Sequence, residues 1–315
     1  MPPTSNIFAG AYLDRAAHLR ADPAWFDAAL ADQRSRVIPV WNLRNLISEG
    51  DSPRPMYLDL SQVEPERRSS ADLLLLGRRG GIDYFALDIE SIDPPSLLPE
   101  TRFEDLRLLA AVLPIDEAGL LGYARAMVSW RRRHRFCGTC GAGTMAAKSG
   151  HVLVCSNPSC RHEQFPRLDP AIIVLVSDAQ RALLGRQAAW PIGRYSTIAG
   201  FVELGESLED AVTREVFEET GIEVDQVEYQ SSQPWPFPAS LMLGFTAHAL
   251  TTEVHLRDEE LEDARWFTRA DIASNTALLP LRQSISFRLI EDWFDAGGST
   301  PLRDILGEAP WSQSR

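Results

Sequence analysis

Short apolar runs recur over the first 130 residues of the chain, and their lengths are those of strands and helices. Runs of strand length occupy 56–60, 72–77 and 82–89. Apolar residues at helical spacing then cover 103–112 and 116–130. Pro114 separates the two predicted helices, and Asp116 is the expected N-cap of the second. This pattern predicts an N-terminal α/β domain, and it contains no evident group of catalytic side chains.

The pattern changes twice beyond this region. Residues 131–166 are rich in basic residues, cysteine and glycine. Farther on, the predicted elements are strands at 171–176, 224–229 and 241–250, an acidic helix, and an amphipathic helix at 283–295. A chain of 315 residues is too long for one typical core. We therefore expect three domains, which are 1–130, 131–166 and 167–315.

Net charge and hydropathy limit which kinds of partner this protein is expected to bind. The formal net charge of −13 argues against broad, charge-driven binding to nucleic acid or to an anionic membrane. The N-terminal stretch has no apolar core of the roughly 7–15 residues that a secretory signal requires. No run approaches the roughly 20 apolar residues of a membrane span. We expect a cytoplasmic protein without a membrane partner.

All four cysteines fall between positions 137 and 160, in the segments CGTCG and CSNPSC. The two pairs are Cys137 with Cys140 and Cys155 with Cys160. Two short loops of this kind bend so that four thiolates meet one tetrahedral Zn²⁺, as in a zinc ribbon. Because four cysteines fill the coordination sphere, we expect one structural zinc ion rather than a catalytic one. The alternative is a set of four buried thiols.

Residues near the cysteines leave two further alternatives open. His134, His151 and His162 are potential replacement ligands, although we expect them on the surface of a small, loop-rich module. The run RRRHR at 131–135 is interpreted either as a phosphate contact or as a solvated linker.

The segment GFVELGESLEDAVTREVFEETGI at 200–222 carries the chemistry most plainly. Ser207, with Asp210 three residues later, predicts a helix that begins near Leu208, and Gly221 is a natural residue to end it. We expect the carboxylates of Glu215, Glu218 and Glu219, at i, i+3 and i+4, to share one helix face. Like charges at this spacing repel one another, so the pattern indicates a bound divalent cation.

The residues around these carboxylates fit such a site. Arg214 is placed to hold one carboxylate, while Gly200 and Gly205 allow the preceding loop to curl back so that backbone carbonyls reach the metal. Hard oxygen ligands suit Mg²⁺ or Mn²⁺ rather than zinc. A cluster of this kind clamps a pyrophosphate and activates water. The alternative is an acidic, solvated helix face.

This segment resembles the Nudix box, Gly-x5-Glu-x7-Arg-Glu-apolar-x-Glu-Glu-x-Gly-apolar, without departure. The matched positions are Gly200, Glu206, Arg214, Glu215, Val216, Glu218, Glu219, Gly221 and Ile222. The resemblance implies a hydrolase of nucleoside diphosphates linked to another group. It also implies a C-terminal Nudix α/β/α sandwich with a mixed sheet, placed after the N-terminal α/β domain and the zinc ribbon.

The segment SQPWPFPAS at 232–240 narrows the substrate. Its prolines stiffen the loop, and Trp235 and Phe237 offer flat faces on which a base or a nicotinamide ring would stack. The alternative is a rigid turn at the edge of the core. The segment is similar at every fixed position to the specificity motif of the NADH pyrophosphatase branch. That branch also has a zinc ribbon and an aromatic-Pro-Arg-x-Asp-Pro stretch, which FPRLDP at 165–170 fits.

The resemblance implies roles for further residues. The family's metal ligands fall on Glu215 and Glu219 with Glu218 between them, on the backbone carbonyl of Ala199, and on Glu260, although Glu259 and Glu262 lie close by. The implied substrate contacts are Phe165, Gln233, Pro234, Trp235, Pro236, Phe237, Pro238, Ala239, Ser240 and Ser286. The second cysteine pair departs from some members of the family, which have two rather than four intervening residues.

The expected activity is hydrolysis of the pyrophosphate of NADH or NAD⁺ to nicotinamide mononucleotide and AMP. Removal of NAD caps from RNA 5′ ends is a further expectation, while an ADP-ribose-type substrate and a non-catalytic zinc-ribbon binding module are the alternatives. We also expect a homodimer, because family members are usually dimers. Apolar residues of the 283–295 helix, together with Trp235, Phe237 and Trp266 if these are exposed, would exceed what a monomer covers. The 233–240 loop would then lie near the dimer interface.

Overall fold

The computed structural model describes residues 6–10, 13–257, 260–274 and 277–307. Its contacts divide the chain into two compact units. The N-terminal unit comprises Ile7–Leu168 and Trp235–Ala239, and the C-terminal unit comprises Met1–Asn6, Asp169–Pro234 and Ser240–Arg315. No helix in the described part of the chain is long and apolar enough to cross a membrane.

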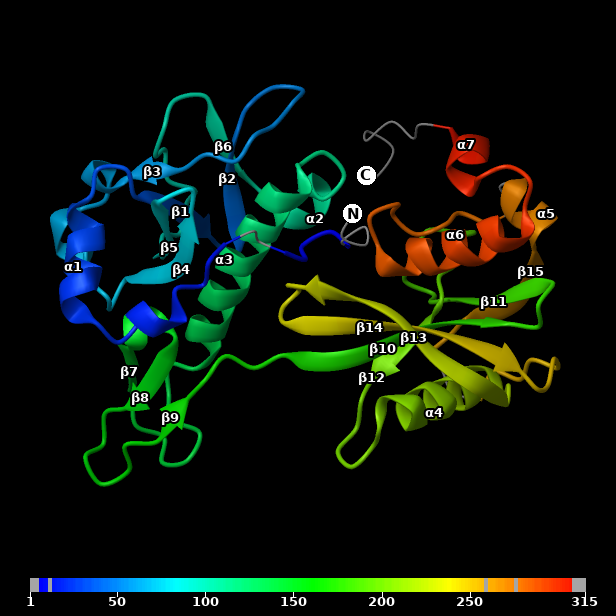
Figure 1. Ribbon diagram of the computed structural model, residues 1–315. Coiled ribbons are helices and arrows are strands. Elements are labelled where there is room, and N and C mark those ends of the chain that lie inside the picture. The colour runs from blue at the N-terminus through cyan, green and yellow to red at the C-terminus, as the bar shows by residue number, and fades with distance from the viewer. Residues whose placement is uncertain (1–5, 11–12, 258–259, 275–276, 308–315) are drawn as a thin grey trace. The chain divides into compact units, whose positions relative to one another are not determined.

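The N-terminal unit is built on a mixed sheet with the strand order β4-β5-β1-β2-β6, with β3 paired to β1 (Figure 1). Strands β1 and β5 are parallel, and the other pairs are antiparallel. Helix α3 packs on one face of the sheet, and α1 packs on the other. The strands are β1 (Arg36–Trp41), β2 (Arg44–Ser48), β3 (Leu58–Asp59), β4 (Leu73–Arg79), β5 (Ile82–Ile89) and β6 (Thr101–Glu104). The helices are η1 (Ala17–Leu19), α1 (Pro23–Ala31), η2 (Leu60–Gln62), η3 (Pro65–Arg67), α2 (Leu106–Leu109) and α3 (Ile115–Arg133).

Several predictions for this unit are confirmed and two are wrong. Strands at 72–77 and 82–89 are present as β4 and β5, whereas only two residues of 56–60 form a strand. The helix expected at 103–112 is wrong, because β6 pairs with β2 and buries Phe103, which leaves only the short α2. Asp116 is not the N-cap of α3. Pro114 holds that position, and Asp116 lies in the first turn, where its charge favours the helix dipole.

The cysteine-bearing segment belongs to the N-terminal unit and forms a three-stranded sheet in the order β7-β8-β9. Its elements are β7 (Thr144–Ala147), η4 (Lys148–Gly150), β8 (Val152–Cys155) and β9 (Glu163–Gln164). Leu153 joins the main core of the unit. Gly150, at φ +87°, approaches strand β4 so closely that a Cβ would lie 2.9 Å from Leu74 Cγ. The segment is thus packed on β4 and is not an independent, solvated loop.

The C-terminal unit contains a second mixed sheet, in the order β13-β14-β10-β11-β15, with β12 paired to β10. Side chains of β10 alternate between two cores: Ile172 and Val174 face α4, while Ile173 and Leu175 face α6. The two helices therefore cover opposite faces (Figure 1), as the predicted α/β/α sandwich requires. The strands are β10 (Asp169–Ser177), β11 (Arg181–Arg186), β12 (Ile198–Phe201), β13 (Val224–Trp235), β14 (Ser240–Ala249) and β15 (Asp263–Thr268). The helices are α4 (Leu208–Thr220), α5 (Arg269–Ala273), α6 (Ile285–Gly297) and α7 (Leu302–Leu306).

The apolar surplus predicted for the last long helix is not found. The apolar side chains of α6 that are buried in the core of its own unit are Ile285, Phe287, Leu289, Ile290 and Phe294. Trp293 packs against the same core, and the guanidinium of Arg269 lies over its ring. Trp266 is likewise half-buried and packs on the α4 side of the sheet. These residues do not form the exposed patch from which a dimer was predicted.

We expect Leu289→Ala to lower the free energy of unfolding by about 2–5 kcal/mol, because this side chain is 1% exposed and its removal leaves a cavity. Leu250→Ala is the matched control, since Leu250 is 56% exposed, and its cost is expected within about 0.5 kcal/mol. Urea denaturation followed by tryptophan fluorescence measures both. Equal costs for the two variants would contradict the burial of α6.

The buried His151 generates a second prediction. Its Nε2 lies 2.6 Å from the carbonyl oxygen of Leu75, and burial lowers the pKa of this histidine to about 4. The unfolded chain therefore binds a proton that the folded chain does not between about pH 6.5 and pH 4, so folding stability is lost as the pH falls through this window. His151→Gln should remove this pH-dependent loss of folding free energy, which totals up to roughly 3 kcal/mol across the window.

His18→Gln supplies the comparison, because it replaces an exposed histidine rather than a buried one. Thermal melts at half-unit pH steps make the comparison. A slope in His151→Gln that matches the wild-type slope would overturn this interpretation.

Candidate active site and metal centre

Helix α4 and the loop before it form the predicted catalytic segment, and the helix is capped as the sequence predicts. Ser207 accepts a hydrogen bond from the backbone N–H of Asp210, and the carboxylate of Asp210 accepts one from the N–H of Ser207. Gly221 ends the helix at φ 71°, in the left-handed region that favours glycine. These caps fix which residues of α4 face the sheet.

The three central glutamates of α4 do not share one environment. Glu215 and Glu219 are 8% and 2% exposed, on the side of the helix that packs against the sheet, whereas the side chain of Glu218 is 52% exposed. The single face expected for all three is therefore divided. Burial raises the pKa of Glu215, and the charges of Glu218 and Glu260 raise it further. Two buried carboxylates on one helix stay ionised only where positive charge compensates them, and Arg214 supplies part of that charge to Glu215.

The position of the Glu215 carboxylate explains why residue 200 is a glycine. A Cβ at this position of β12 would overlap the carboxylate of Glu215, which lies directly over the backbone there. Any larger residue at 200 would displace that carboxylate or the strand. The neighbouring Ala199 is half-buried and pairs with Ile173 of β10. The end of β12 and the buried face of α4 are thus fitted to each other.

Arg214 binds the acidic residues and the loop together. Its guanidinium contacts Glu206 at 2.5 Å, and Glu215 and Glu218 at 2.9 Å each. These partners raise the pKa of Arg214, and Arg214 in turn lowers the pKa of Glu206 to about 2.

Two backbone groups also help to attach the loop between β12 and α4 to the helix. The sequence motif alone does not reveal them. Arg214 donates to the carbonyl of Phe201, and Glu206 accepts from the backbone N–H of Glu203. The loop between β12 and α4 is held by its backbone as well as by side chains.

The four cysteines form the other candidate metal centre. Within the described stretches of the chain, they are the one group of three or more His, Cys, Asp or Glu side chains whose ligand atoms all lie within 4.8 Å of one another. The sulfurs of Cys137 and Cys160 are 3.9 Å apart, and those of Cys140 and Cys155 are 3.4 Å apart. Zn–S bonds of about 2.3 Å in a tetrahedron place sulfurs roughly 3.8 Å apart, so the donor set fits zinc.

The four thiols do not share one environment, because burial raises the pKa of the Cys155 thiol to about 12, whereas the surroundings of Cys137 favour the thiolate. The backbone N–H of Thr139 is directed at the sulfur of Cys137 and lowers the pKa of that thiol to about 6. The nearby histidines have other roles: His134 contacts the carbonyl of Trp130, and His151 is buried against β4 instead of being on the surface. His162 is exposed.

The remaining predicted site residues divide between the two units. Gln233, Pro234, Ser240, Glu260 and Ser286 belong to the C-terminal unit, while Phe165 and the segment Trp235–Ala239 belong to the N-terminal unit. Phe165 is 45% exposed. Glu262 contacts Arg186, and Glu259 lies outside the described residues.

Two of these residues are bound to neighbouring protein groups. Ser286 is buried, and its hydroxyl contacts Ser196 Oγ at 2.8 Å and accepts from Thr197. Gln233, 1% exposed, accepts from Ile285 N–H and donates to the carbonyl of Gln283. Both therefore link segments of the C-terminal unit around the start of α6.

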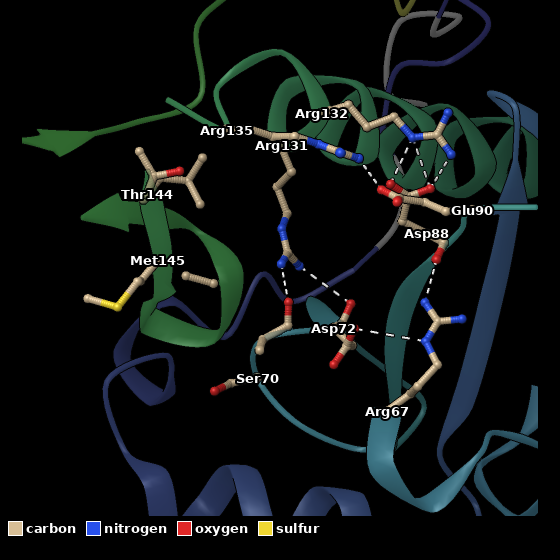
Figure 2. A pocket seen from close by; sticks show the side chains of 13 residues that line it. Arg67, Ser70, Asp72, Asp88, Glu90, Arg131, Arg132, Arg135, Thr144 and Met145 are labelled. Atoms are coloured by element: carbon tan, nitrogen blue, oxygen red, sulfur yellow. Dashed lines mark hydrogen bonds and ion pairs between the residues drawn. The ribbon is translucent and has the colours of Figure 1, made fainter. Parts of the chain in front are cut away.

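A cavity of about 760 Å³ lies in the N-terminal unit, and its lining includes four arginines and three acidic residues. Figure 2 shows how these side chains lie around it. Arg132 forms a paired contact with Asp88, and Arg135 contacts Glu90. Arg131 donates to the backbone carbonyls of residues 71 and 72. The solvated linker predicted for 131–135 is wrong, because residues 131–133 end α3 and Arg131, Arg132 and Arg135 contact acids or carbonyls; only Arg133 of these arginines is exposed without a described contact.

Comparison with known families matches three consecutive parts of the chain. Residues 34–130 match the NADH pyrophosphatase-like rudimentary NUDIX domain, residues 132–165 the NADH pyrophosphatase zinc ribbon domain, and residues 167–290 the NUDIX domain.

Curated relatives extend the similarity. The chain is 39% identical over 309 residues to the NAD-capped RNA hydrolase NudC of Mycobacterium bovis, covering 89% of this chain and 92% of the relative. It is 42% identical over 216 residues to NudC of Stutzerimonas stutzeri, covering 69% and 75%. It is 38% identical over 235 residues to the NAD-capped RNA hydrolase NUDT12 of Macaca fascicularis, covering 68% of this chain and 50% of the relative, so it spans about half the length of that protein. The chain belongs to the Nudix hydrolase family, among the members that carry the NADH pyrophosphatase zinc ribbon.

Proposed function

We propose that this protein hydrolyses the pyrophosphate bond of NADH and NAD⁺, giving nicotinamide mononucleotide (reduced or oxidised) and AMP, and that it removes NAD caps from RNA 5′ ends. The observation that carries the proposal is the pair of buried carboxylates on α4, Glu215 and Glu219, of which Glu215 lies over Gly200 and contacts Arg214. The relatives named NAD-capped RNA hydrolase support the choice of substrate.

We assign the binding of Mg²⁺ or Mn²⁺ to the carboxylates of Glu215, Glu218, Glu219 and Glu260 with the backbone carbonyl of Ala199. Bound divalent cations supply Lewis acidity to phosphoryl oxygens. Glu260 is preferred to Glu262 because its charge acts on Glu215, whereas Glu262 is engaged by Arg186. Arg214 and Glu206 fix the loop and the helix relative to each other.

The reaction forms one bond and breaks one. A water oxygen bonds to one phosphorus, the bridging P–O bond breaks, and the displaced phosphate leaves as the second mononucleotide. The proton of the water passes to a glutamate that acts as general base. Phe165, Gln233–Ser240 and Ser286 are the proposed substrate-contacting residues.

One alternative is a Nudix hydrolase of another nucleoside diphosphate such as ADP-ribose, and another is a non-catalytic zinc-ribbon module. The intact set of carboxylates argues against the module. Product analysis on NADH, NAD⁺, ADP-ribose and NAD-capped RNA in parallel tests the proposal. Release of AMP from NADH is the expected result, and turnover of ADP-ribose alone would overturn it.

Three finer expectations accompany this proposal. The domain boundaries at 130/131 and 166/167 and a cytoplasmic location stay predictions. The homodimer also stays a prediction, now without the apolar patch that first motivated it. Light scattering at micromolar protein concentration distinguishes a dimer from a monomer by the mass of the particle in solution.

Glu219→Gln should leave the fold intact and lower turnover of NADH by on the order of 10²- to 10⁴-fold, because it removes a charge from the cation site. Glu209→Gln, on the exposed face of the same helix, is the matched control and should keep wild-type turnover. Near-wild-type turnover of folded Glu219→Gln at saturating Mg²⁺ would show that the metal assignment is wrong.

The purified protein should carry one Zn²⁺ per chain, and Cys137→Ser should lose it and melt at a lower temperature, because structural zinc contributes folding free energy. Elemental analysis and thiol titration measure the two states. Zinc-free protein with four reactive thiols and an unchanged melting temperature would contradict this prediction.

A further inference from the structure

The segment Trp235–Ala239 is part of the N-terminal unit, although its neighbours Pro234 and Ser240 belong to the C-terminal unit. The chain thus leaves one compact unit for five residues and returns. These five residues are the centre of the SQPWPFPAS motif. Their contacts within the N-terminal unit show what holds the motif in place.

The aromatic rings of this segment pack against protein groups. Trp235 and Phe237 meet edge to face at 5.0 Å between ring centroids, and Phe8 meets them at 6.1 and 5.8 Å. Both rings are half-buried against the core of the unit that contains α3. Pro236 is buried, and it approaches Gly122 of α3 so closely that a Cβ there would lie 3.4 Å from its ring.

Arg125 of α3 provides the polar part of this attachment. Its side chain donates to the backbone carbonyls of Pro236 and Leu43, and its guanidinium lies over the ring of Phe237 at 4.5 Å. The exposed Arg107 lies over the same ring at 4.3 Å. Arg125 is 7% exposed, and burial lowers its pKa. In the described structure its hydrogen bonds go to carbonyls rather than to a carboxylate.

The stretches next to this segment are attached to the C-terminal unit. The side-chain amide of Gln233 accepts a hydrogen bond from Ile285 N–H and donates one to the carbonyl of Gln283, next to the start of α6. Asn6 donates to the carbonyl of Ser232 at 2.8 Å, and Phe8, two residues later, belongs to the N-terminal unit. Within the N-terminal unit, Arg125 therefore holds the part of the motif that follows Pro234.

We propose that Arg125 is a positioning residue for substrate recognition: through Pro236 and Phe237 it fixes the 233–240 motif in the conformation that contacts the dinucleotide. Arg125 then affects substrate affinity without supplying a group to the chemistry. This inference rests on the proposed function.

The energetics favour positioning over simple stabilisation. A buried guanidinium pays a desolvation penalty that an apolar side chain of the same size avoids, so stability alone does not select for it. A planar group with several donors fixes two carbonyls and a ring in one geometry. The contacts of Arg125 therefore fix the conformation of the 235–239 segment more than they stabilise the apolar core behind it.

The test is steady-state kinetics of NADH hydrolysis by Arg125→Met, which keeps the volume of the side chain and removes the donors. We expect KM to rise about tenfold, the equivalent of one lost charged hydrogen bond, while kcat stays within about twofold. Arg125→Lys keeps the charge but places all its donors on one nitrogen, so it should restore part of the affinity. Thermal melts of each variant separate affinity from stability.

Arg79→Met is the matched control in the same unit. Arg79 pairs with Asp116 and Glu117 of α3 at 3.2 and 2.8 Å, and its guanidinium lies over the ring of Tyr84. Its replacement loosens the same helix and should leave KM unchanged. An equal rise of KM in Arg79→Met, or a wild-type KM in Arg125→Met, would overturn the proposal.

If Arg125→Met does not fold, Arg107→Met tests the inference, because Arg107 is exposed and its loss should spare the fold. A two- to fivefold rise in KM is then expected, and an unchanged KM would overturn the proposal. Hydrolysis of NADH by the wild-type protein tests the proposed function separately, since that result does not depend on any of these variants.

Discussion

The burial of Glu215 and Glu219 is the constraint on which the rest of the C-terminal unit depends. Both lie on the same side of α4 as Val212 and Val216, which pack against the sheet. An ionised carboxylate in this position loses its hydration and repels the other, so the helix requires positive charge at its buried face. Arg214 supplies part of that charge.

The same constraint explains the residues around α4 in the order in which they occur along the chain. A glycine is needed at 200 because the carboxylate of Glu215 occupies the space of a side chain there. Glu206 is needed because Arg214 must be held across the loop, and the loop must turn sharply at Gly205, where φ is 96°. The motif is thus a set of mutually dependent packing and charge conditions as well as a list of ligands.

Local signals of this kind are what the sequence predicts well. Ser207, Asp210 and Gly221 determine the ends of α4 through contacts a few residues apart, and the cysteine spacing determines a four-sulfur cluster in the same way. The helix predicted at 103–112 is wrong because the pairing of β6 with β2, more than 50 residues away in the chain, overrides a helical pattern.

Burial by distant segments explains the other errors. The apolar residues of α6 were predicted to exceed what one face could bury, but α6 meets both the sheet and α7. Arg125 shows most clearly which contacts cannot be predicted from the sequence. It stands in an ordinary amphipathic stretch, and its bond to Pro236 joins residues 111 positions apart. Neither spacing nor residue type around it predicts this contact.

The distribution of positive charge bears on how an acidic protein handles an anionic substrate. The arginines at 131, 132 and 135 are bound to acids and carbonyls of their own unit, Arg214 is bound by three glutamates, and Arg125 is buried under the aromatic segment. None of these five is left as a free cation for a phosphate. On the proposed function, we expect bound divalent cations to supply positive charge to the pyrophosphate, while these five arginines hold the surfaces on which those cations and the dinucleotide are placed.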